Sequence, residues 1–264
     1  MRTKLFINGF SYLIGDADAA DFTPFVETRK LRRMEGISKN ALLCAFRAFA
    51  QAGVDINAPK TETGLSIAMG AGALESTCKF MDSIITDGDA LSSPTAFAGS
   101  VHNSAGLTLS MFLHITGPCL ITGQLDASFS GALLTAQQLL AKKMCQDVLV
   151  AVAEDINPVV ADIAPAHEPD FASLLQGYPN PFKRAAAAFL ITDMPTEKTQ
   201  FALENIAFSR DDAAVQSKDL GFCSCAHSAV SFACELERGG DFNFCSHFAG
   251  STLKAEAKKY VAQK

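Results

Sequence analysis

The chain has 264 residues, of which 48% are hydrophobic, and this length and composition allow one large buried core. Its 22 basic and 28 acidic residues give a net charge of -6, which excludes the basic surface expected of a nucleic-acid-binding protein. No stretch reaches the ~20 apolar residues of a membrane-spanning helix, and segment 1–10 is predicted to be a strand, not a signal peptide. We therefore expect a soluble, cytoplasmic protein.

The eight cysteines do not form a pattern that predicts disulfides or a metal site. Six of them stand singly in apolar segments, which is typical of reduced cysteines in a protein core. Only Cys223 and Cys225 lie close together, and one such pair without a second group of ligands is poor evidence for zinc. We therefore expect no metal and no cofactor.

In the first part of the chain, short apolar runs alternate with longer segments in which the apolar residues have helical spacing. Ser38 is placed to cap a helix that ends at Gly53, and Gly117-Pro118 indicates a turn. The six consecutive apolar residues at 148–153 are typical of a strand that is buried on both faces. Between these, we predict strands at 65–69 and 119–125 and helices at 76–87, 97–113 and 130–143.

The second part begins with a proline-rich segment, 157–181, which is predicted to be a long loop with one short helix at 171–175. After it we predict strands at 185–192 and 201–208, a helix at 225–237, a strand at 242–245 and a lysine-rich tail. The alternation of strands and helices along the whole chain favours an α/β fold with a largely buried sheet.

The order of features between Pro94 and Glu154 is specific. A proline, a small-residue helix with an asparagine, a Gly-Pro turn, a strand, a tight elbow, a helix and a buried strand with an acidic end follow one another. Here they are Pro94, Asn103-Ser104-Ala105-Gly106, Gly117-Pro118, the strand from Leu120, the elbow at 126–131 and the VLVAVAED run at 148–155. This segment resembles the core of the β-ketoacyl-acyl carrier protein synthases (ketosynthases), which have the thiolase fold.

The resemblance implies a cysteine nucleophile at the elbow. It would stand at the N-terminus of a buried helix, where the helix dipole and free amides stabilise a thiolate and an oxyanion. Three ways of aligning the segment put this position at Asp126, Ala127 or Ser128, and none of them is a cysteine. The nearest cysteines, Cys119 and Cys145, belong to a predicted strand and a predicted helix end.

The second half departs further from the ketosynthase pattern. The family's His-Gly-Thr-Gly-Thr segment has no room after Phe208, so the first catalytic histidine is absent. In the next motif, Lys218 lies one position from the expected lysine, and Phe222 stands where the resemblance implies the second histidine. Segment 247–251 resembles the Gly-Phe-Gly-Gly-Thr loop that gates the ketosynthase pocket, and Phe248 is expected to keep the gating position.

The resemblance implies a layered α-β-α-β-α fold in a single ketosynthase-like domain over 1–264. Its first half, 1–156, is complete, and its second half, 185–264, is shortened. Loss of the nucleophile and the histidines is typical of chain-length factors, which pair with an active β-ketoacyl synthase. The shortened form is similar to the ketosynthase-like partner of aryl polyene systems. The expected partners are an active ketosynthase, in a heterodimer, and an acyl carrier protein, without nucleic acid or membrane insertion.

The thiolase fold dimerises through the strand that precedes the elbow. This strand and the helix at 97–113 are therefore expected to face the partner and to line the tunnel for the growing chain. The candidate residues are Asn103, Leu107, Met111, Phe112, Leu120 and Thr122. Ordinary core packing is the alternative for Leu107, Met111 and Phe112, because apolar faces of helices are usually buried.

Ser128 has two interpretations. A serine at a helix N-terminus is usually a cap. As an acyl acceptor it would need a base, for which His102 and the other histidines are weak candidates, and the Gly-x-Ser-x-Gly elbow of hydrolases is absent. A malonyl-carrier-protein decarboxylase is a further alternative, with Gln124 as the only nearby amide, and a carrier-protein-binding scaffold without a tunnel is another.

A basic cluster precedes Met34 and consists of Arg29, Lys30, Arg32 and Arg33. It could contact an acidic carrier protein. The alternative is a solvated loop or helix start, since runs of charge are usually solvated.

Overall fold

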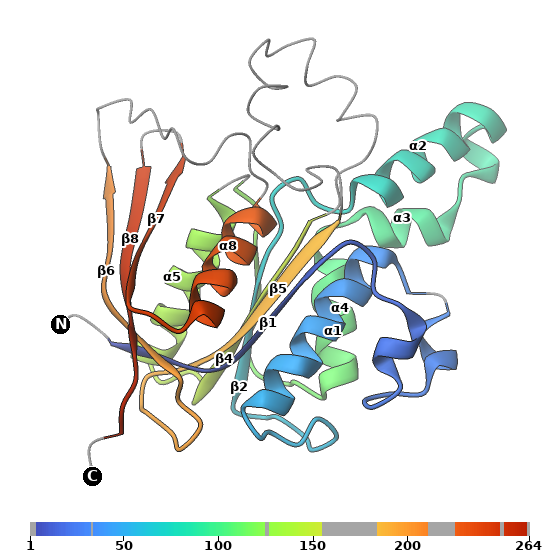
Figure 1. Cartoon of the computed structure of the whole chain (residues 1–264). Helices are drawn as coiled ribbons and strands as arrows, with labels where there is room; N and C mark the ends of the chain where they lie inside the picture. Colours follow the sequence, from blue (N-terminus) through green and yellow to red (C-terminus); the bar gives the residue numbers. More distant parts are fainter. Residues whose placement is uncertain are drawn as a thin grey trace.

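The computed structural model of the chain describes residues 4–32, 34–124, 127–154, 184–210, 225–248 and 251–262. Its centre is an eight-stranded sheet with the strand order β3-β2-β4-β5-β1-β6-β8-β7 (Figure 1). The first five positions are held by β1 (Leu5–Ile14), β2 (Thr63–Ala68), β3 (Cys119–Thr122), β4 (Asp147–Glu154) and β5 (Ala185–Thr192). Strand β2 is parallel to β3 and β4, whereas β5 is antiparallel to β4 and β1.

The strand predicted at 148–153 is confirmed as β4, and all six of these residues are 0% exposed. Helices cover both of its faces, so both sets of alternating side chains are buried and both must be apolar. Strand β5 is buried in the same way over Ala185–Ile191, and it begins with four alanines that let helices approach closely.

The remaining strands, β6 (Phe201–Arg210), β7 (Phe242–Phe248) and β8 (Ser251–Lys259), diverge from the first five. Only three residues of β1, Leu5 to Ile7, pair with β6. The expectation of a lysine-rich tail after the last strand is wrong, because this tail forms β8. Its Leu253, Ala255 and Ala257 are buried and alternate with exposed or half-exposed charged residues, which is the period of a half-buried strand.

The described residues form six α-helices: α1 (Gly36–Gln51), α2 (Leu74–Asp87), α3 (Pro94–Ser100), α4 (Asn103–Leu113), α5 (Ser128–Ala141) and α8 (Cys225–Arg238). Helices α1 and α4 lie on one face of the first five strands, and α5 and α8 lie between these strands and β6-β8-β7 (Figure 1). Short 3-10 segments occur at Ala19–Phe22, Thr28–Leu31 and Asp89–Leu91.

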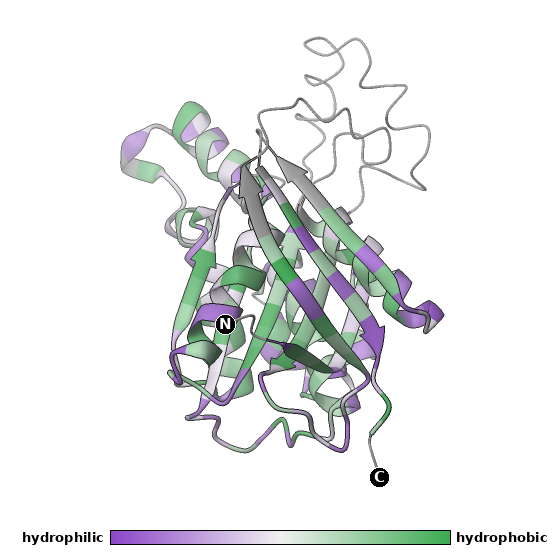
Figure 2. Cartoon of the chain, turned by 90° about the vertical axis from the view of Figure 1, so that its left-hand side faces the viewer, coloured by the Kyte–Doolittle hydropathy of each residue, from purple (hydrophilic) through white to green (hydrophobic). Residues whose placement is uncertain are grey.

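The described residues thus form the layers α, β, α and β of the expected fold. Figure 2 shows the outer side of β6, β8 and β7 without a covering helix among the described residues, and hydrophilic and hydrophobic positions alternate along it. A sheet with one polar face does not need a further helical layer.

The middle helices are joined to both parts of the sheet by a cluster of aromatic rings. Phe129 of α5 contacts Phe189 of β5, Phe232 of α8 and Phe244 of β7 at centroid separations of 5.6 to 5.8 Å. Full burial of such a side chain contributes roughly 1.5–3 kcal/mol. This cluster therefore fixes the start of α5, where the elbow lies.

Three local expectations are wrong. The helix predicted at 97–113 is two helices, because Val101 has extended backbone angles (φ −82°, ψ 140°) that end α3 before α4 begins. Ser38 does not cap α1, which begins at Gly36 with Glu35 as its N-cap residue. Strand β3 ends at Thr122 instead of continuing to residue 125. The short helix predicted at 171–175 lies outside the described residues.

Candidate functional site

The elbow lies where β3 turns into α5. Ser128 is the first residue of α5 and is 0% exposed. Its hydroxyl accepts a hydrogen bond from the backbone N–H of Gln124 (2.7 Å) and donates one to the carbonyl oxygen of Met69 (3.3 Å). The N-cap residue is Ala127, so Ser128 is not the cap that its position predicts. Its hydroxyl instead joins the end of β2, the turn after β3 and the start of α5.

The elbow positions carry no thiol. Of the three positions at which the resemblance implies a cysteine, Ala127 and Ser128 are described, and Asp126 lies outside the described residues. Cys145 follows the far end of α5, which at 1.5 Å per residue is about 20 Å from Ser128. Cys119 is the first residue of β3, and its sequence position on that strand is as predicted.

The same two cysteines are not activated. Desolvation raises the pKa of the Cys119 thiol above its ordinary value of 9.0. Desolvation, and then the charge of Asp147, raise the pKa of Cys145 as well. A reactive cysteine needs a lowered pKa, because the thiolate is the nucleophile. Neither cysteine has the environment that a thiolate nucleophile requires.

A buried carboxylate beside the elbow holds the turn that follows β2. Glu154, at the end of β4, is 2% exposed and accepts hydrogen bonds from the backbone N–H groups of Gly70 (2.8 Å) and Ala71 (2.7 Å). Hydrogen bonds to an ionised acceptor are roughly twice as strong as neutral ones. The sequence indicated an acidic residue at the end of this strand. It did not predict the backbone groups that the carboxylate binds, which lie more than 80 positions away in the chain.

His102 lies against this turn, beside the residues that lead from β3 into the elbow. Gly72 has a φ of +80°, and a Cβ atom at this position would be 2.8 Å from the His102 ring. The same ring lies 3.5 Å from the place of a Cβ atom on Gly123. Two glycines therefore make room for one imidazole. From the sequence, His102 was only a weak candidate for a base. The packing against these two glycines is what places the His102 ring beside the elbow.

The predicted interface residues gather on α4 and β3. Among the described residues, strand β3 is an edge of the sheet and pairs only with β2. Leu107 and Met111 of α4 are 63% and 64% exposed, and Leu120 of β3 is 44% exposed, so none of the three is a core residue in this chain. Asn103 is also exposed, and Thr122 is half-buried. Only Phe112 follows the alternative interpretation, because it is half-buried and packs on the core beside α1.

Small residues bring α4 onto β3, as the sequence predicts. A Cβ atom on Gly106 would lie 3.2 Å from the Ile121 side chain and 3.4 Å from Cys119 Sγ. Ala105 is 0% exposed on the same side of the helix. The exposed apolar side chains of α4 and β3 consequently belong to one surface.

Arg29 and Lys30 of the basic cluster lie on the 3-10 segment Thr28–Leu31, which Leu31 anchors with a buried side chain, and Arg32 follows this segment. Arg29 and Arg32 are exposed, and Arg29 forms an ion pair with Glu27. Arg33 and Phe222 lie outside the described residues. Phe248 is the last residue of β7, and its side chain is outside the description as well.

Metal-binding clusters and membrane-spanning helices are both absent from the described residues. These residues hold no group of three or more His, Cys, Asp or Glu side chains arranged for a metal ion. Across the same residues, no helix combines the length and the hydrophobicity of a transmembrane span.

Solved structures with a similar fold include chains of ketosynthase complexes. One chain of a type II polyketide synthase acyl-carrier protein in complex with its ketosynthase bound to the hexaketide (AntDE:AntF) matches with a TM-score of 0.74 and 9% identity, over 99% of this chain and 100% of that one. The ishigamide ketosynthase/chain length factor gives 0.71 and 14%, over 97% and 99%. The ketosynthase ApeO with its chain length factor ApeC, from Xenorhabdus doucetiae, gives 0.64 and 16%, over 96% and 99%.

These matches, with the layers and the strand order, define the thiolase-like fold of the ketosynthases. Because the sequence identities are only 9 to 16%, these structural matches establish the fold and nothing about the function. Among curated proteins no sequence match is found. The sequence itself matches the family described as beta-ketoacyl synthase, N-terminal domain, over residues 15–220, and the chain belongs to this family.

Proposed function

We propose that this chain is a non-catalytic ketosynthase-like subunit, a chain-length factor, which pairs with an active β-ketoacyl-acyl carrier protein synthase in polyketide or aryl polyene synthesis. One observation carries the proposal. At the elbow, the described positions are an alanine and a buried serine whose hydroxyl is used in structural hydrogen bonds. Loss of one member of a catalytic unit removes most of its rate, so the chain is not expected to condense acyl groups alone.

The edge strand supports the pairing. An exposed, apolar edge strand is a template for association, which proteins normally cover or interrupt. In β3 neither a charge nor a proline interrupts the sequence Cys-Leu-Ile-Thr. Leu107 and Met111 continue the apolar surface on α4. A ketosynthase subunit that adds its own edge strand at β3 would cover all of these groups.

The proposal also covers the domain organisation, the interface residues and the basic cluster. Residues 1–264 form one ketosynthase-like domain, with 1–156 as its first half and 185–264 as its shortened second half. Asn103 and Met111 contribute to the interface and the tunnel wall, and Arg29, Arg32 and Arg33 contact the carrier protein. The described part of this cluster agrees with such a contact, because Arg29 and Arg32 are exposed. A cytoplasmic location accompanies the proposal.

The alternative enzymatic functions have less support. As an acyl acceptor, Ser128 would have to become accessible and give up its bonds to Gln124 and Met69. A decarboxylase would use the side chain of Gln124, which is exposed. A carrier-protein-binding scaffold would need neither β3 nor α4 to be covered by a ketosynthase.

Co-expression with a candidate active ketosynthase tests the proposal. We expect a one-to-one complex that elongates carrier-bound chains, and that Leu107→Asp disrupts. Met194→Asp is the control, because Met194 is 67% exposed at the end of β5, away from α4 and β3. Product length is the second readout, and we expect Met111→Ala to lengthen the products. Absence of any complex, or condensing activity of the isolated chain, would contradict the assignment.

A further inference from the structure

The α2–α3 hairpin projects from the body of the fold (Figures 1 and 2). The described residues hold twelve exposed large apolar side chains, and eight of them lie between Met81 and Leu120. Four belong to the hairpin, namely Met81, Ile85, Leu91 and Phe97. The other four are Val101, which follows α3, Leu107 and Met111 of α4, and Leu120 of β3. Helix α3 of the hairpin packs against α4, so the hairpin adjoins the proposed interface.

On α2 the outward residues form a stripe. Cys78, Met81 and Ile85 are spaced by three and four positions, and this spacing places them on one side of a helix. Met81 is 48% exposed and Ile85 is 77% exposed. The other side of α2 is already in use, because Phe80 packs on Phe97 of α3 at 5.2 Å between ring centroids. The stripe is thus additional to the packing that holds the hairpin together.

The tip of the hairpin is held by its own contacts. Ser83 Oγ accepts a hydrogen bond from the backbone N–H of Ser93 at 3.0 Å. Ser93 in turn caps α3 by accepting from the N–H of Ala96. The first of these bonds ties Ser83 of α2 to Ser93 at the start of α3, ten residues further along the chain. The hairpin is therefore a formed element and not an extended loop.

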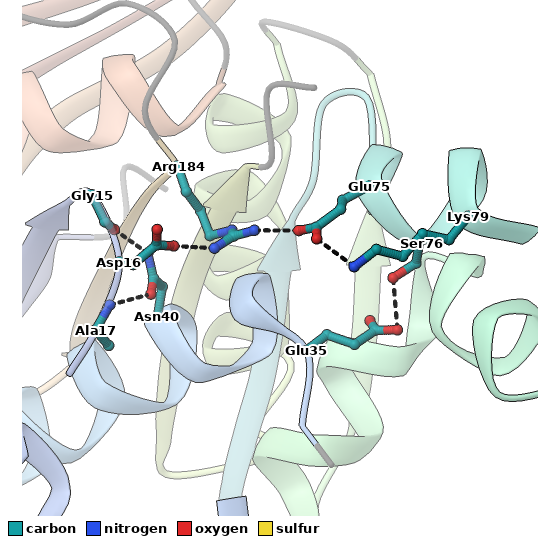
Figure 3. A network of polar contacts seen from close by, with 9 residues as sticks. All are labelled: Gly15, Asp16, Ala17, Glu35, Asn40, Glu75, Ser76, Lys79 and Arg184. Atoms are coloured by element: carbon teal, nitrogen blue, oxygen red, sulfur yellow. Dashed lines mark hydrogen bonds and ion pairs between the residues drawn. The ribbon is translucent and has the colours of Figure 1, made fainter. Parts of the chain in front are cut away.

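The base of the hairpin is fixed by charged groups (Figure 3). Arg184, at the start of β5, forms ion pairs with Glu75 of α2 (2.5 Å) and with Asp16, which follows β1. Ser76 donates a hydrogen bond to Glu35 at 2.7 Å. Gly99 of α3 leaves room for this carboxylate, because a Cβ atom there would lie 1.4 Å from Glu35 Oε1. The direction of the hairpin is thus set before any partner binds.

We propose that the α2–α3 hairpin is an arm that grips the partner ketosynthase through the Cys78, Met81 and Ile85 stripe. The inference rests on the proposed function and extends its interface. A stable interface takes about 20–30 residues from each side. Strand β3 offers four residues, and α4 offers one face of eleven residues, which is too few. The hairpin supplies the missing surface, and its fixed base lowers the entropy lost on binding.

The test measures the affinity of the full chain for the co-expressed ketosynthase. Ile85→Asp places a charge in the stripe, and we expect the dissociation constant to rise at least about tenfold. Val261→Asp is the matched control, because Val261 is also 77% exposed but lies after β8. We expect this control to change the constant less than about twofold. Hydrogen exchange of the α2 amides should also slow in the complex.

The outcomes separate the arm from the proposed function. If the wild-type complex forms and Leu107→Asp weakens it while Ile85→Asp does not, the arm is refuted and the chain-length factor survives. If no complex forms with the ketosynthase, both are refuted. Self-association that Ile85→Asp abolishes, with unchanged ketosynthase affinity, would assign the stripe to a second copy and overturn the inference.

Discussion

Removal of the Ser128 hydroxyl distinguishes a structural serine from an acyl acceptor. In Ser128→Ala, the N–H of Gln124 and the carbonyl of Met69 lose a partner at 2.7 and 3.3 Å. A buried group left without its partner costs about 1–3 kcal/mol. Because the Gln124 end is close to solvent, we take about 1–3 kcal/mol for the pair of bonds together. For a chain of this size, the melting temperature should fall by roughly 3–9 °C.

The chain offers a matched control two residues further along. Ser130 lies in the same turn of α5 and is 3% exposed, and its buried hydroxyl has no hydrogen-bond partner among the described residues. Ser130→Ala removes a polar group that gains nothing from burial, and alanine is the better helix former. We expect the melting temperature of Ser130→Ala to equal or exceed that of the wild type.

Two measurements complete this test. Thermal unfolding followed by circular dichroism gives the order of stability, which should be Ser128→Ala below wild type and wild type at or below Ser130→Ala. Incubation with a loaded acyl carrier protein, followed by mass spectrometry, should show no acyl adduct on the wild type. Equal melting of the two variants would refute the role of the Ser128 bonds. An adduct that Ser128→Ala abolishes would make the chain an acyltransferase.

Three further predictions follow from the described residues. Phe129→Ala opens the centre of the aromatic cluster and should cost about 3–5 kcal/mol in chemical unfolding, and a loss below 1 kcal/mol would contradict that packing. Burial raises the pKa of Cys44 to about 12, so at pH 8.5 a thiol reagent should label exposed Cys119 in the native protein and Cys44 only after unfolding. Hydrogen bonds from Lys258 and then Lys4 lower the pKa of Glu204 to about 2 from 4.5, so its stabilisation is present above pH 4.5 and is lost as pH falls toward 2. Glu204→Gln should flatten the stability curve in this window by less than about 1 kcal/mol, since the pair is near the surface, and an unchanged curve would rule out the coupling.

Local patterns predicted most of the elements. The apolar run at 148–153 indicated a doubly buried strand because six such residues in sequence fit a strand covered on both faces better than a half-exposed one. The small residues of α4 indicated a close approach, which Gly106 makes to β3. Prediction was wrong where a local signal had two outcomes. Ser38 has the chemistry of a cap, but the backbone had already turned helical at Gly36.

The break at Val101 and the last strand show the same limit. No glycine-proline turn or other strong break signal stands between 97 and 113, so the sequence did not mark the extended residue that separates α3 from α4. The alternation of Leu253, Ala255 and Ala257 was a readable strand signal, which the surrounding lysines obscured. Neighbouring strands β6 and β7 select the extended form there by pairing with both edges of β8.

Residue identity and spacing are enough to establish that the elbow positions lack a cysteine and that no His-Gly-Thr-Gly-Thr segment follows Phe208. Which side chains meet depends on the three-dimensional packing. Glu154 reaches the amides of Gly70 and Ala71, His102 fills the space over Gly72, and Arg184 orients the hairpin through Glu75. Such contacts join residues far apart in the chain. Their partners are chosen by the packing of whole layers, and a local pattern carries no record of them.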